Sequence, residues 1–180
     1  MRILETERIL LKPVEQEDLS FLMNLRWDAS LTDYIIHDPI SLNSQHVWLE
    51  NIRKKGDLAL SIFYKETSDD SKIVLIGITG LYDFNYRHQR AVWKSLRILP
   101  EYQGRGIAFE ASDLLINYGF NTLNLNKITS DSFENNNNII KLLGKLGFKK
   151  EGVLKQHYFH QGEFKDAAIY SLLRKNYKPL

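Results

Sequence analysis

The chain has 180 residues, of which 43% are hydrophobic and 26% charged, with a formal net charge of +2 at pH 7 and no cysteine. This composition is typical of a globular domain, and the missing cysteines exclude disulfides, thiolate catalysis and cysteine-bound zinc. The small, dispersed charge argues against a nucleic-acid-binding protein, and the absence of a run of 18 apolar residues argues against a membrane span.

The first half of the chain predicts one strand, two helices and three strands. The stretch from Met1 to Glu7 carries acids where a signal peptide would have its apolar core, so we expect a cytoplasmic protein. The predicted elements are a strand over Arg8–Lys12, helices over Glu17–Trp27 and Ser44–Gly56, and strands over Leu58–Tyr64, Ile73–Leu81 and Ala91–Leu99. The polar stretch Lys65–Lys72 indicates a hairpin loop and not a domain boundary, so we expect one domain over residues 1–180.

The pattern Gln103-x-x-Gly106-x-Ala108 lies between the last of these strands and a helical repeat of apolar residues. Glycine at 104 and 106 lets the backbone turn tightly and expose its N–H groups. At the N-terminus of a helix, such groups favour an anion. The spacing matches neither a P-loop nor a dinucleotide fingerprint, and an ordinary strand-to-helix turn is the competing interpretation.

The second half predicts a helix, a strand, a helix and two strands. The helix begins at Ile107 and is followed by a strand over Lys127–Phe133. Four asparagines, Asn135–Asn138, then favour the start of a second helix, which Gly147 ends. Two long strands, Phe148–Phe159 and Glu163–Arg174, form a hairpin. The order predicts an α+β domain with a mainly antiparallel sheet.

This order of elements, with the Gln103 to Ala108 loop at its centre, resembles the GNAT family of acetyl-CoA-dependent N-acetyltransferases. The closest resemblance is to the group that acetylates ribosomal-protein N-termini. Three stretches carry it: Glu5–Pro13 is similar to "ETERLxLRP", Lys145–Gly152 to "KLGFxxEG", and Val153–Tyr170 to "GxLK…G…D…Y". The resemblance implies a mixed, mainly antiparallel sheet of six to seven strands, flanked by about four helices, with strands four and five splayed.

The resemblance also implies acetyl-CoA as co-substrate and no metal. Its pantetheine arm would insert between the splayed strands, pairing with backbone groups of Arg97, Ile98 and Leu99, as in strand addition. Backbone N–H groups from Gln103 to Ala108 would hold the pyrophosphate. Asn136 lies where the family places an asparagine that contacts the cofactor, a role compatible with capping a helix. The full set of candidate donor-binding residues is Arg97, Ile98, Leu99, Gln103, Gly104, Arg105, Gly106, Ile107, Ala108 and Asn136.

Acetyl transfer requires a neutral amine, a stabilised oxyanion and a proton for the leaving thiolate. Where many relatives have a base-like glutamate and an acidic tyrosine, this chain has Trp93 and Leu143. Asp83 and Ser132 are therefore the candidate catalytic residues, with Ser132 or a water protonating the thiolate. A mechanism without a dedicated side-chain base, which relies on proximity, is the leading hypothesis.

The candidate acceptor-binding residues are aromatic: Trp27, Tyr34, Tyr82 and Trp93. The acceptor is expected to be a protein or peptide N-terminus or a small amine, such as an amino sugar or a polyamine. The lack of a strong acidic patch weighs against a polyamine. The alternative is a non-catalytic acyl-CoA-binding or regulatory domain. We expect a monomer or homodimer without nucleic-acid or membrane partners.

Overall fold

A computed structural model of the chain describes residues 4–28, 31, 34, 40–66 and 72–179. One seven-stranded sheet runs through these residues in the order β1-β2-β3-β4-β5-β7-β6, and only the β4–β5 pair is parallel. The strands are β1 (Ile9–Pro13), β2 (Leu58–Lys65), β3 (Ile73–Asn85), β4 (Arg90–Ile98), β5 (Lys127–Phe133), β6 (Lys149–His160) and β7 (Glu163–Leu173).

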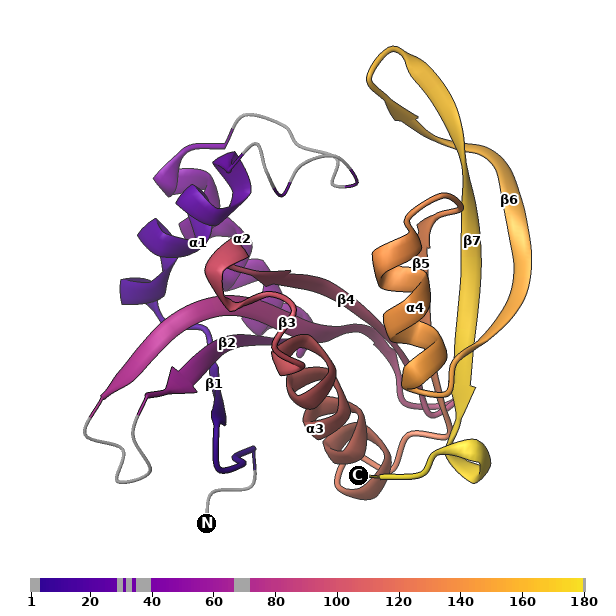
Figure 1. The fold of residues 1–180 in the computed structure, drawn as a ribbon, viewed down its shortest axis with the longest axis horizontal. Helices are drawn as coiled ribbons and strands as arrows, with labels where there is room; N and C mark the ends of the chain where they lie inside the picture. Colours follow the sequence, from indigo (N-terminus) through magenta and orange to yellow (C-terminus); the bar gives the residue numbers. More distant parts are fainter. Residues whose placement is uncertain (1–3, 29–30, 32–33, 35–39, 67–71, 180) are drawn as a thin grey trace.

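Four α-helices accompany the sheet in the described part of the chain. They are α1 (Leu19–Trp27), α2 (Leu42–Lys55), α3 (Ile107–Asn121) and α4 (Asn137–Lys145), with 3-10 turns over Gln16–Asp18, Pro100–Tyr102 and Arg174–Asn176. Figure 1 shows α1 and α2 on one side of strands β2–β4 and α3 on the other, with α4 beside β5. The α+β class, the mixed sheet and the number of helices expected from the sequence are confirmed.

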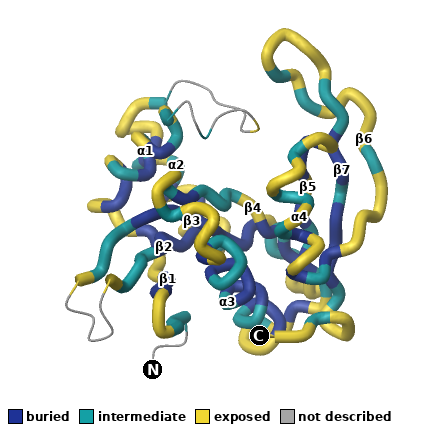
Figure 2. The backbone as a smooth tube through the Cα atoms, viewed as in Figure 1, coloured by how far each residue is buried: buried dark blue, intermediate teal, exposed yellow. Residues whose placement is uncertain are grey.

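Two hydrophobic cores lie on the two sides of the sheet. The larger joins α3 and α4 to residues such as Leu81, Trp93 and Ile98, and the smaller joins α1 and α2 to Ile78 and Tyr82. Because side chains alternate across a strand, neighbouring residues of β3 enter different cores. In Figure 2 the inner face of α3 is buried, whereas most of β6 at the sheet edge is exposed.

Most element boundaries differ from the sequence expectation by one or two residues, and β3 differs by four. Strand β3 ends at Asn85 and not at Leu81, because Leu81 and Tyr82 continue to pair with β4. Helix α1 begins at Leu19 and not at Glu17, because a 3-10 turn precedes it, in which the buried Asp18 carboxylate accepts hydrogen bonds from the Glu15 N–H and the Ser61 hydroxyl. Residues 67–71 of the expected Lys65–Lys72 loop lie outside the described residues.

Strand β4 contains a bulge that decides which face its later residues occupy. Ile78 and Gly80 of β3 are two positions apart, but their partners Arg97 and Lys94 are three apart, so β4 has one extra residue. Ser95 within the bulge adopts a left-handed backbone with φ of 69°. Bulges bend a strand and redirect its side chains, and they are frequent next to active sites.

Candidate functional site

A cavity opens where β4 and β5 separate. The two strands pair only at Arg90–Lys127, Ala91–Ile128 and Val92–Thr129, and they diverge beyond these pairs. The cavity between them has a volume of about 990 Å³. Its walls come from the second halves of β4 and β5, the start of α3 and one face of α4. The splay expected for strands four and five is therefore present.

The loop before α3 is shaped to receive an anion. Gly104 and Gly106 have positive φ angles of 73° and 79°, a conformation that residues with a Cβ adopt only under strain. Gly106 is the N-cap of α3, so no side chain caps the first N–H groups of this 15-residue helix. A Cβ added at Gly104 would meet no atom within 4 Å, so the loop is open on that side. A pyrophosphate fits this helix N-terminus.

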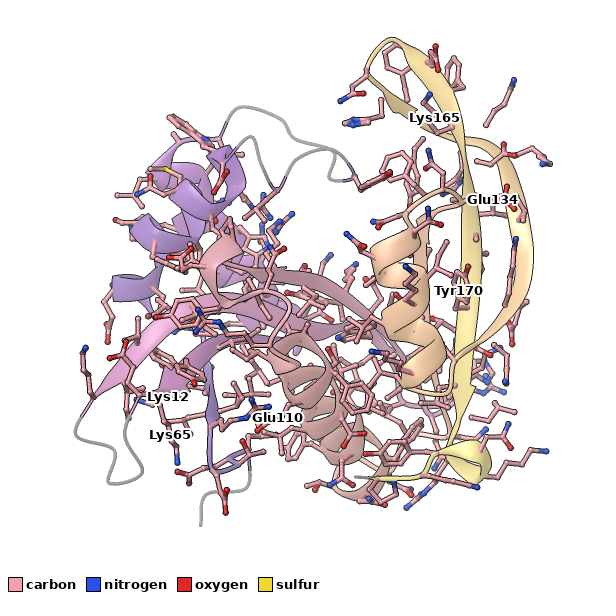
Figure 3. The ribbon with its side chains drawn as sticks, viewed as in Figure 1. Lys12, Lys65, Glu110, Glu134, Lys165 and Tyr170 are labelled. Atoms are coloured by element: carbon pink, nitrogen blue, oxygen red, sulfur yellow. The ribbon has the colours of Figure 1, made fainter. Side chains whose placement is uncertain are left out.

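The N-terminal segment braces the same helix start. The Arg8 guanidinium donates from Nε to the Glu110 carboxylate at 2.9 Å and from Nη1 to the Arg105 carbonyl at 3.3 Å. Thr6 donates its hydroxyl proton to the other Glu110 oxygen. Figure 3 shows Glu110 on the side of α3 that faces the N-terminal strand. Because Glu110 lies in the first turn of α3, its pairing with Arg8 limits its repulsion of an incoming anion.

Backbone groups on the open edge of β4 are available to a ligand strand. The N–H of Leu99 donates to the Ile76 carbonyl at 2.9 Å, so it points toward β3. Since these groups alternate in direction along a strand, those of Ile98 point to the open edge. There the Gln103 side-chain amide donates to the Ile98 carbonyl at 2.9 Å. The Ile98 N–H is thus the donor best placed for a ligand amide.

Asn136 caps α4, as its sequence context indicated, and also lines the cavity. Its side-chain oxygen accepts the N–H of Ile139 at 3.3 Å. Ile139 lies on the cavity wall, whereas Leu143 is fully buried in the core. Lys141 and Lys145 add positive charge to the wall that α4 provides.

Aromatic residues form the opposite end of this cavity. Tyr34 lies 6.1 Å from Phe133, and Tyr158 of the final hairpin lies 5.0 Å from the same ring, measured between ring centres. The Tyr158 hydroxyl donates to the Asp131 carboxylate. Burial, followed by the bond to Asp131, raises the pKa of Tyr158, so this phenol stays protonated at neutral pH.

Trp93 and Ser132 both line the cavity, but the polar N–H of Trp93 is already hydrogen-bonded within the protein. The Trp93 indole N–H donates to the Thr79 hydroxyl at 3.0 Å, and its ring packs against Phe148. Trp93 can therefore offer a ligand only the face or edge of its ring. Ser132 is buried on β5, opposite Ala168 of β7, and its side chain lines the cavity.

A second cavity, of about 520 Å³, lies between α2 and the ends of β3 and β4. Lys94 and Ser95 line both cavities, so the two adjoin across β4. Asp83 lines the second cavity and pairs with Lys94 at 2.7 Å, and its own N–H donates to the Asp57 carboxylate at 2.7 Å. Asp83 is thus engaged in an ion pair on the side of β4 away from α3.

Tyr82 is the most enclosed polar side chain of the second cavity, with 3% of its surface exposed. Its hydroxyl has no hydrogen bond of normal geometry with the described residues. Burial raises its pKa, which the nearby Ser95 hydroxyl and then Arg97 partly oppose. Burial also lowers the pKa of Arg97 to about 10, and repulsion from Arg26 adds to this effect.

The structure gathers most, but not all, of the residues singled out from the sequence. The large cavity is lined by Tyr34, Trp93, Arg97, Ile98, Gln103, Gly104, Gly106, Ala108, Ser132 and Asn136. Tyr82 and Asp83 line the second cavity instead. Ile107 is buried in the core, and Leu99 and Arg105 flank the loop without lining either cavity. Trp27 is 62% exposed at the end of α1 and lines neither cavity.

Sequence reasoning did not predict three side-chain associations at the site. These are the Arg8–Glu110 brace, the Tyr158–Asp131 pair, and Arg26 with Arg97 around Tyr82. Each joins residues far apart in the chain, so no local pattern signals it. Among the described residues, no cluster of three or more His, Asp or Glu side chains is arranged to hold a metal ion. None of the helices in the described ranges is long and apolar enough to cross a membrane.

Known proteins resemble this chain along most of its length. Residues 8–149 match the family described as "Acetyltransferase (GNAT) domain". The uncharacterized N-acetyltransferase p20 of Bacillus licheniformis is 34% identical, covering 98% of this chain and 99% of that protein. A spermidine N(1)-acetyltransferase of Escherichia coli K12 is 30% identical, covering 94% and 88% respectively. A ribosomal protein uS5-alanine N-acetyltransferase of the same strain matches at 27% over 66% of this chain and 61% of its own.

Solved structures agree with this relationship. A spermidine N-acetyltransferase from Vibrio cholerae, in complex with CoA and spermine, superimposes with a TM-score of 0.84. The two share 26% identity, and the alignment covers 96% of this chain and 99% of that one. The splayed strands, the glycine loop and the capped fourth helix agree with the family match, and the chain belongs to the GNAT family of acetyltransferases.

Proposed function

We propose that this enzyme transfers the acetyl group of acetyl-CoA to a primary amine by direct attack within a ternary complex. One observation carries the proposal: the cavity at the β4–β5 splay also has the α3 N-terminus and Asn136 in its wall. A thioester placed between the strands would then lie beside both anion-binding and amide-pairing groups. The N–H groups at the α3 N-terminus suit a phosphate, and the open strand edge suits an amide, so together they suit a phosphorylated thioester better than any other donor class.

The chain's own residues supply donor binding and orientation. The N–H groups at the start of α3 would hold the pyrophosphate, and the open backbone edge at Ile98 would pair with an amide of the pantetheine arm. Lys141 and Lys145 add a favourable field for the remaining phosphate. With the donor fixed between two strands, the reaction gains mainly from proximity and orientation.

In the transfer step, the neutral amine nitrogen attacks the thioester carbonyl, the new C–N bond forms, and the C–S bond breaks as coenzyme A leaves as a thiolate. A backbone N–H of β4 can stabilise the oxyanion, so no side chain is required there. The proton lost by the amine passes to the thiolate through Ser132 or a water. Trp93 and Leu143 are both uncharged and buried, so no ionisable side chain stands at either position.

The proposed acceptor is a protein or peptide N-terminus or a small amine such as an amino sugar or a polyamine. The spermidine N-acetyltransferases among the relatives support a small amine. The ribosomal-protein relative supports a peptide N-terminus, although it covers less of the chain. The second cavity beside the splay, with a volume of about 520 Å³, suits a small acceptor better than an extended peptide.

Thiol release from acetyl-CoA, measured with a panel of amines, tests the transfer. Turnover with at least one primary amine supports it, and binding of acetyl-CoA without turnover on any amine contradicts it. The base-free mechanism is tested with Asp83→Asn, Asp131→Asn and Glu134→Gln. A general base typically contributes about 10²- to 10⁴-fold, so we expect each variant to keep turnover within about 10-fold of the parent. A single variant that abolishes turnover with acetyl-CoA affinity intact would sink the base-free mechanism.

A further inference from the structure

Three cationic side chains surround the ring of Tyr82 beneath α1 and α2. Arg26 comes from α1, and Lys94 and Arg97 come from the two sides of the β4 bulge. The Lys94 ammonium lies 5.1 Å from the centre of the Tyr82 ring and pairs with Asp83 at 2.7 Å. Neither Arg26 nor Arg97 forms an ion pair with any residue in the described part of the chain.

Two polar atoms of this cluster are buried without a partner. The Arg97 Nε has no hydrogen bond with the residues that the structure describes, and the Tyr82 hydroxyl, although near the Ser95 hydroxyl, has none of normal geometry with them. Buried polar groups are nearly always satisfied, so each exception calls for an explanation. Both atoms are donors, and they belong to neighbouring side chains. The two donors therefore belong to one cluster and need a common explanation.

The charge of the cluster is not neutralised internally. Tyr82 is held in its neutral phenol form, since burial raises its pKa. Arg97 remains protonated at neutral pH, because burial and repulsion from Arg26 lower its pKa only to about 10. Burial also lowers the pKa of Arg26, but Tyr82 opposes this shift. Two guanidinium charges therefore lie near Tyr82 and repel one another at neutral pH.

The other charged groups of the second cavity do not offset this excess. Asp83 is committed to Lys94, and the Asp57 carboxylate accepts the backbone N–H of Asp83 but keeps its negative charge. Lys55, at the end of α2, lines the same wall and offsets the charge of Asp57. On the adjoining side of β4, Asp131 accepts the hydroxyl of Tyr158. Arg26, which lines the second cavity, and Arg97, which lines the large one, are left as the cations available to a ligand where the two cavities adjoin.

The backbone is shaped to hold this cluster in place. A Cβ on Gly80 would lie 2.5 Å from Cε2 of Tyr82 and 2.5 Å from the Leu58 carbonyl oxygen, so only glycine leaves room for the ring. The bulge at Ser95 turns Arg97 onto the same side of the sheet as Tyr82. Lys94 and Ser95 line both cavities, so the cluster adjoins the splay where acetyl transfer is proposed.

We propose that the acceptor amine carries an anionic oxygen group, a carboxylate or a phosphate, which Arg26, Arg97 and the Tyr82 hydroxyl bind. This inference rests on the proposed transfer of acetyl to an amine, and it narrows the acceptor class. A planar guanidinium matches carboxylate and phosphate geometry, and its charge-assisted hydrogen bonds are among the strong ones. The same two charges repel a polyamine, so this chain would differ from its spermidine-acetylating relatives in acceptor.

Binding of matched acetylated products to the CoA-loaded protein tests the inference independently of turnover. Calorimetry would compare N-acetyl-γ-aminobutyrate with its amide, and N-acetyl-O-phosphoethanolamine with N-acetylethanolamine. Charge-assisted hydrogen bonds are worth about 1.5–3 kcal/mol, so we expect the anionic member of at least one pair to bind about 10- to 100-fold more tightly. The pair with the larger difference identifies carboxylate or phosphate. Equal affinities within both pairs, no binding of any member, or tighter binding of N-acetylspermidine overturn the inference.

Variants assign the effect to the cluster. Arg26→Gln should remove most of the preference for the anionic member, and Tyr82→Phe, which keeps the ring against Gly80, should reduce it about 3- to 10-fold for one lost hydrogen bond. Arg87→Gln, at an exposed turn, is the matched control and should keep the full preference. Preference unchanged in both cluster variants overturns the assignment. Thiol release separates the two proposals. Anion-selective binding without turnover supports the anion site and contradicts the proposed acetyl transfer. Turnover without anion selectivity supports the acetyl transfer and contradicts the anion site.

Discussion

The two cavities that adjoin at β4 differ in whether backbone groups or side chains form their proposed binding surfaces. On the α3 side, the part of the wall proposed to hold the donor is formed by backbone: the glycine loop, the start of a helix and the open edge of a strand. On the α1 and α2 side, charged and aromatic side chains from three elements converge on Tyr82. A backbone wall recognises features that every acyl-CoA shares, whereas a side-chain wall changes with each substitution. The proposed donor end thus depends on backbone that any acyl-CoA can use, and the proposed acceptor end depends on side chains that a substitution can change.

The largest expected effect comes from Gly80→Ala, which should damage the acceptor end alone. The added Cβ would meet the Leu58 carbonyl and the Tyr82 ring at 2.5 Å. Overpacking of this kind costs about 1–3 kcal/mol, measurable as a lower urea midpoint of unfolding. Displacement of the Tyr82 ring should also weaken binding of anionic acceptors about 10-fold, because the hydroxyl leaves the arginines.

Gly144→Ala is the control for this change, since an added Cβ at Gly144 in α4 meets nothing within 4 Å. It should leave stability equal or higher, because alanine favours helix. Acetyl-CoA affinity should stay within about two-fold in both variants, a difference close to 0.4 kcal/mol. An equal loss of donor affinity in Gly80→Ala would show that the two cavities do not act separately.

Gly106→Val addresses the donor end alone. A β-branched residue at a φ of 79° is strained, and the left-handed conformation costs a non-glycine residue about 1–2 kcal/mol. We expect the Kd of acetyl-CoA, measured by calorimetry, to rise about 10-fold as the α3 N-terminus shifts. The preference among acceptors should not change.

Gly152→Val is the matched control, because Gly152 lies on the exposed β6 strand with open space around it. It should bind acetyl-CoA as the parent does. Donor affinity that survives Gly106→Val would mean that the pyrophosphate does not rest on this loop.

The smallest effect is expected for Arg8→Gln, which removes the brace from Glu110. The pair is partly exposed, and such ion pairs are worth about 0–1 kcal/mol. The freed Glu110 charge near the α3 N-terminus should raise the Kd of acetyl-CoA by roughly 3-fold, and more at low salt than at high salt. The double variant Arg8→Gln with Glu110→Gln should recover most of the affinity. Failure of this recovery would show that Arg8 acts by holding the loop and not through the charge of Glu110.

The donor end could be predicted from the sequence because its signals are local. Gly104 and Gly106 shape the turn before α3 and Asn136 caps α4, each within a few residues of itself, so local sequence indicated these structures, and the resemblance to the family supplied their proposed role toward the donor. The strand and helix order was predictable for the same reason, with small errors where Asp18 and Tyr82 make long-range contacts.

The acceptor end could not be predicted in this way. Arg26 and Arg97 are 71 positions apart (97 minus 26) and become neighbours only because α1 packs against β3, the strand beside β4. Trp93 attracted attention as a replacement for a glutamate, but the sequence could not show that Thr79 takes its indole N–H. Aromatic content alone also suggested Trp27, which lies away from both cavities. Which side chains come together from distant parts of the chain can be seen only in the tertiary structure.

The extra residue at Ser95 decides which face of the sheet each later residue of β4 occupies. Before it, Trp93 shares a face with Leu81 and enters the larger core, and Lys94 shares the opposite face with Gly80. Strict alternation would then send Arg97 into the larger core and Ile98 to the other side, but the inserted residue reverses both assignments. A deletion of Ser95 would remove the bulge and leave Arg97 two positions from Lys94, so Arg97 and Ile98 would keep their faces on a straighter strand. An unbulged pairing of the unchanged sequence would instead exchange a guanidinium for an isoleucine in two places at once, so the bulge is what keeps both residues on their faces at the present length of β4.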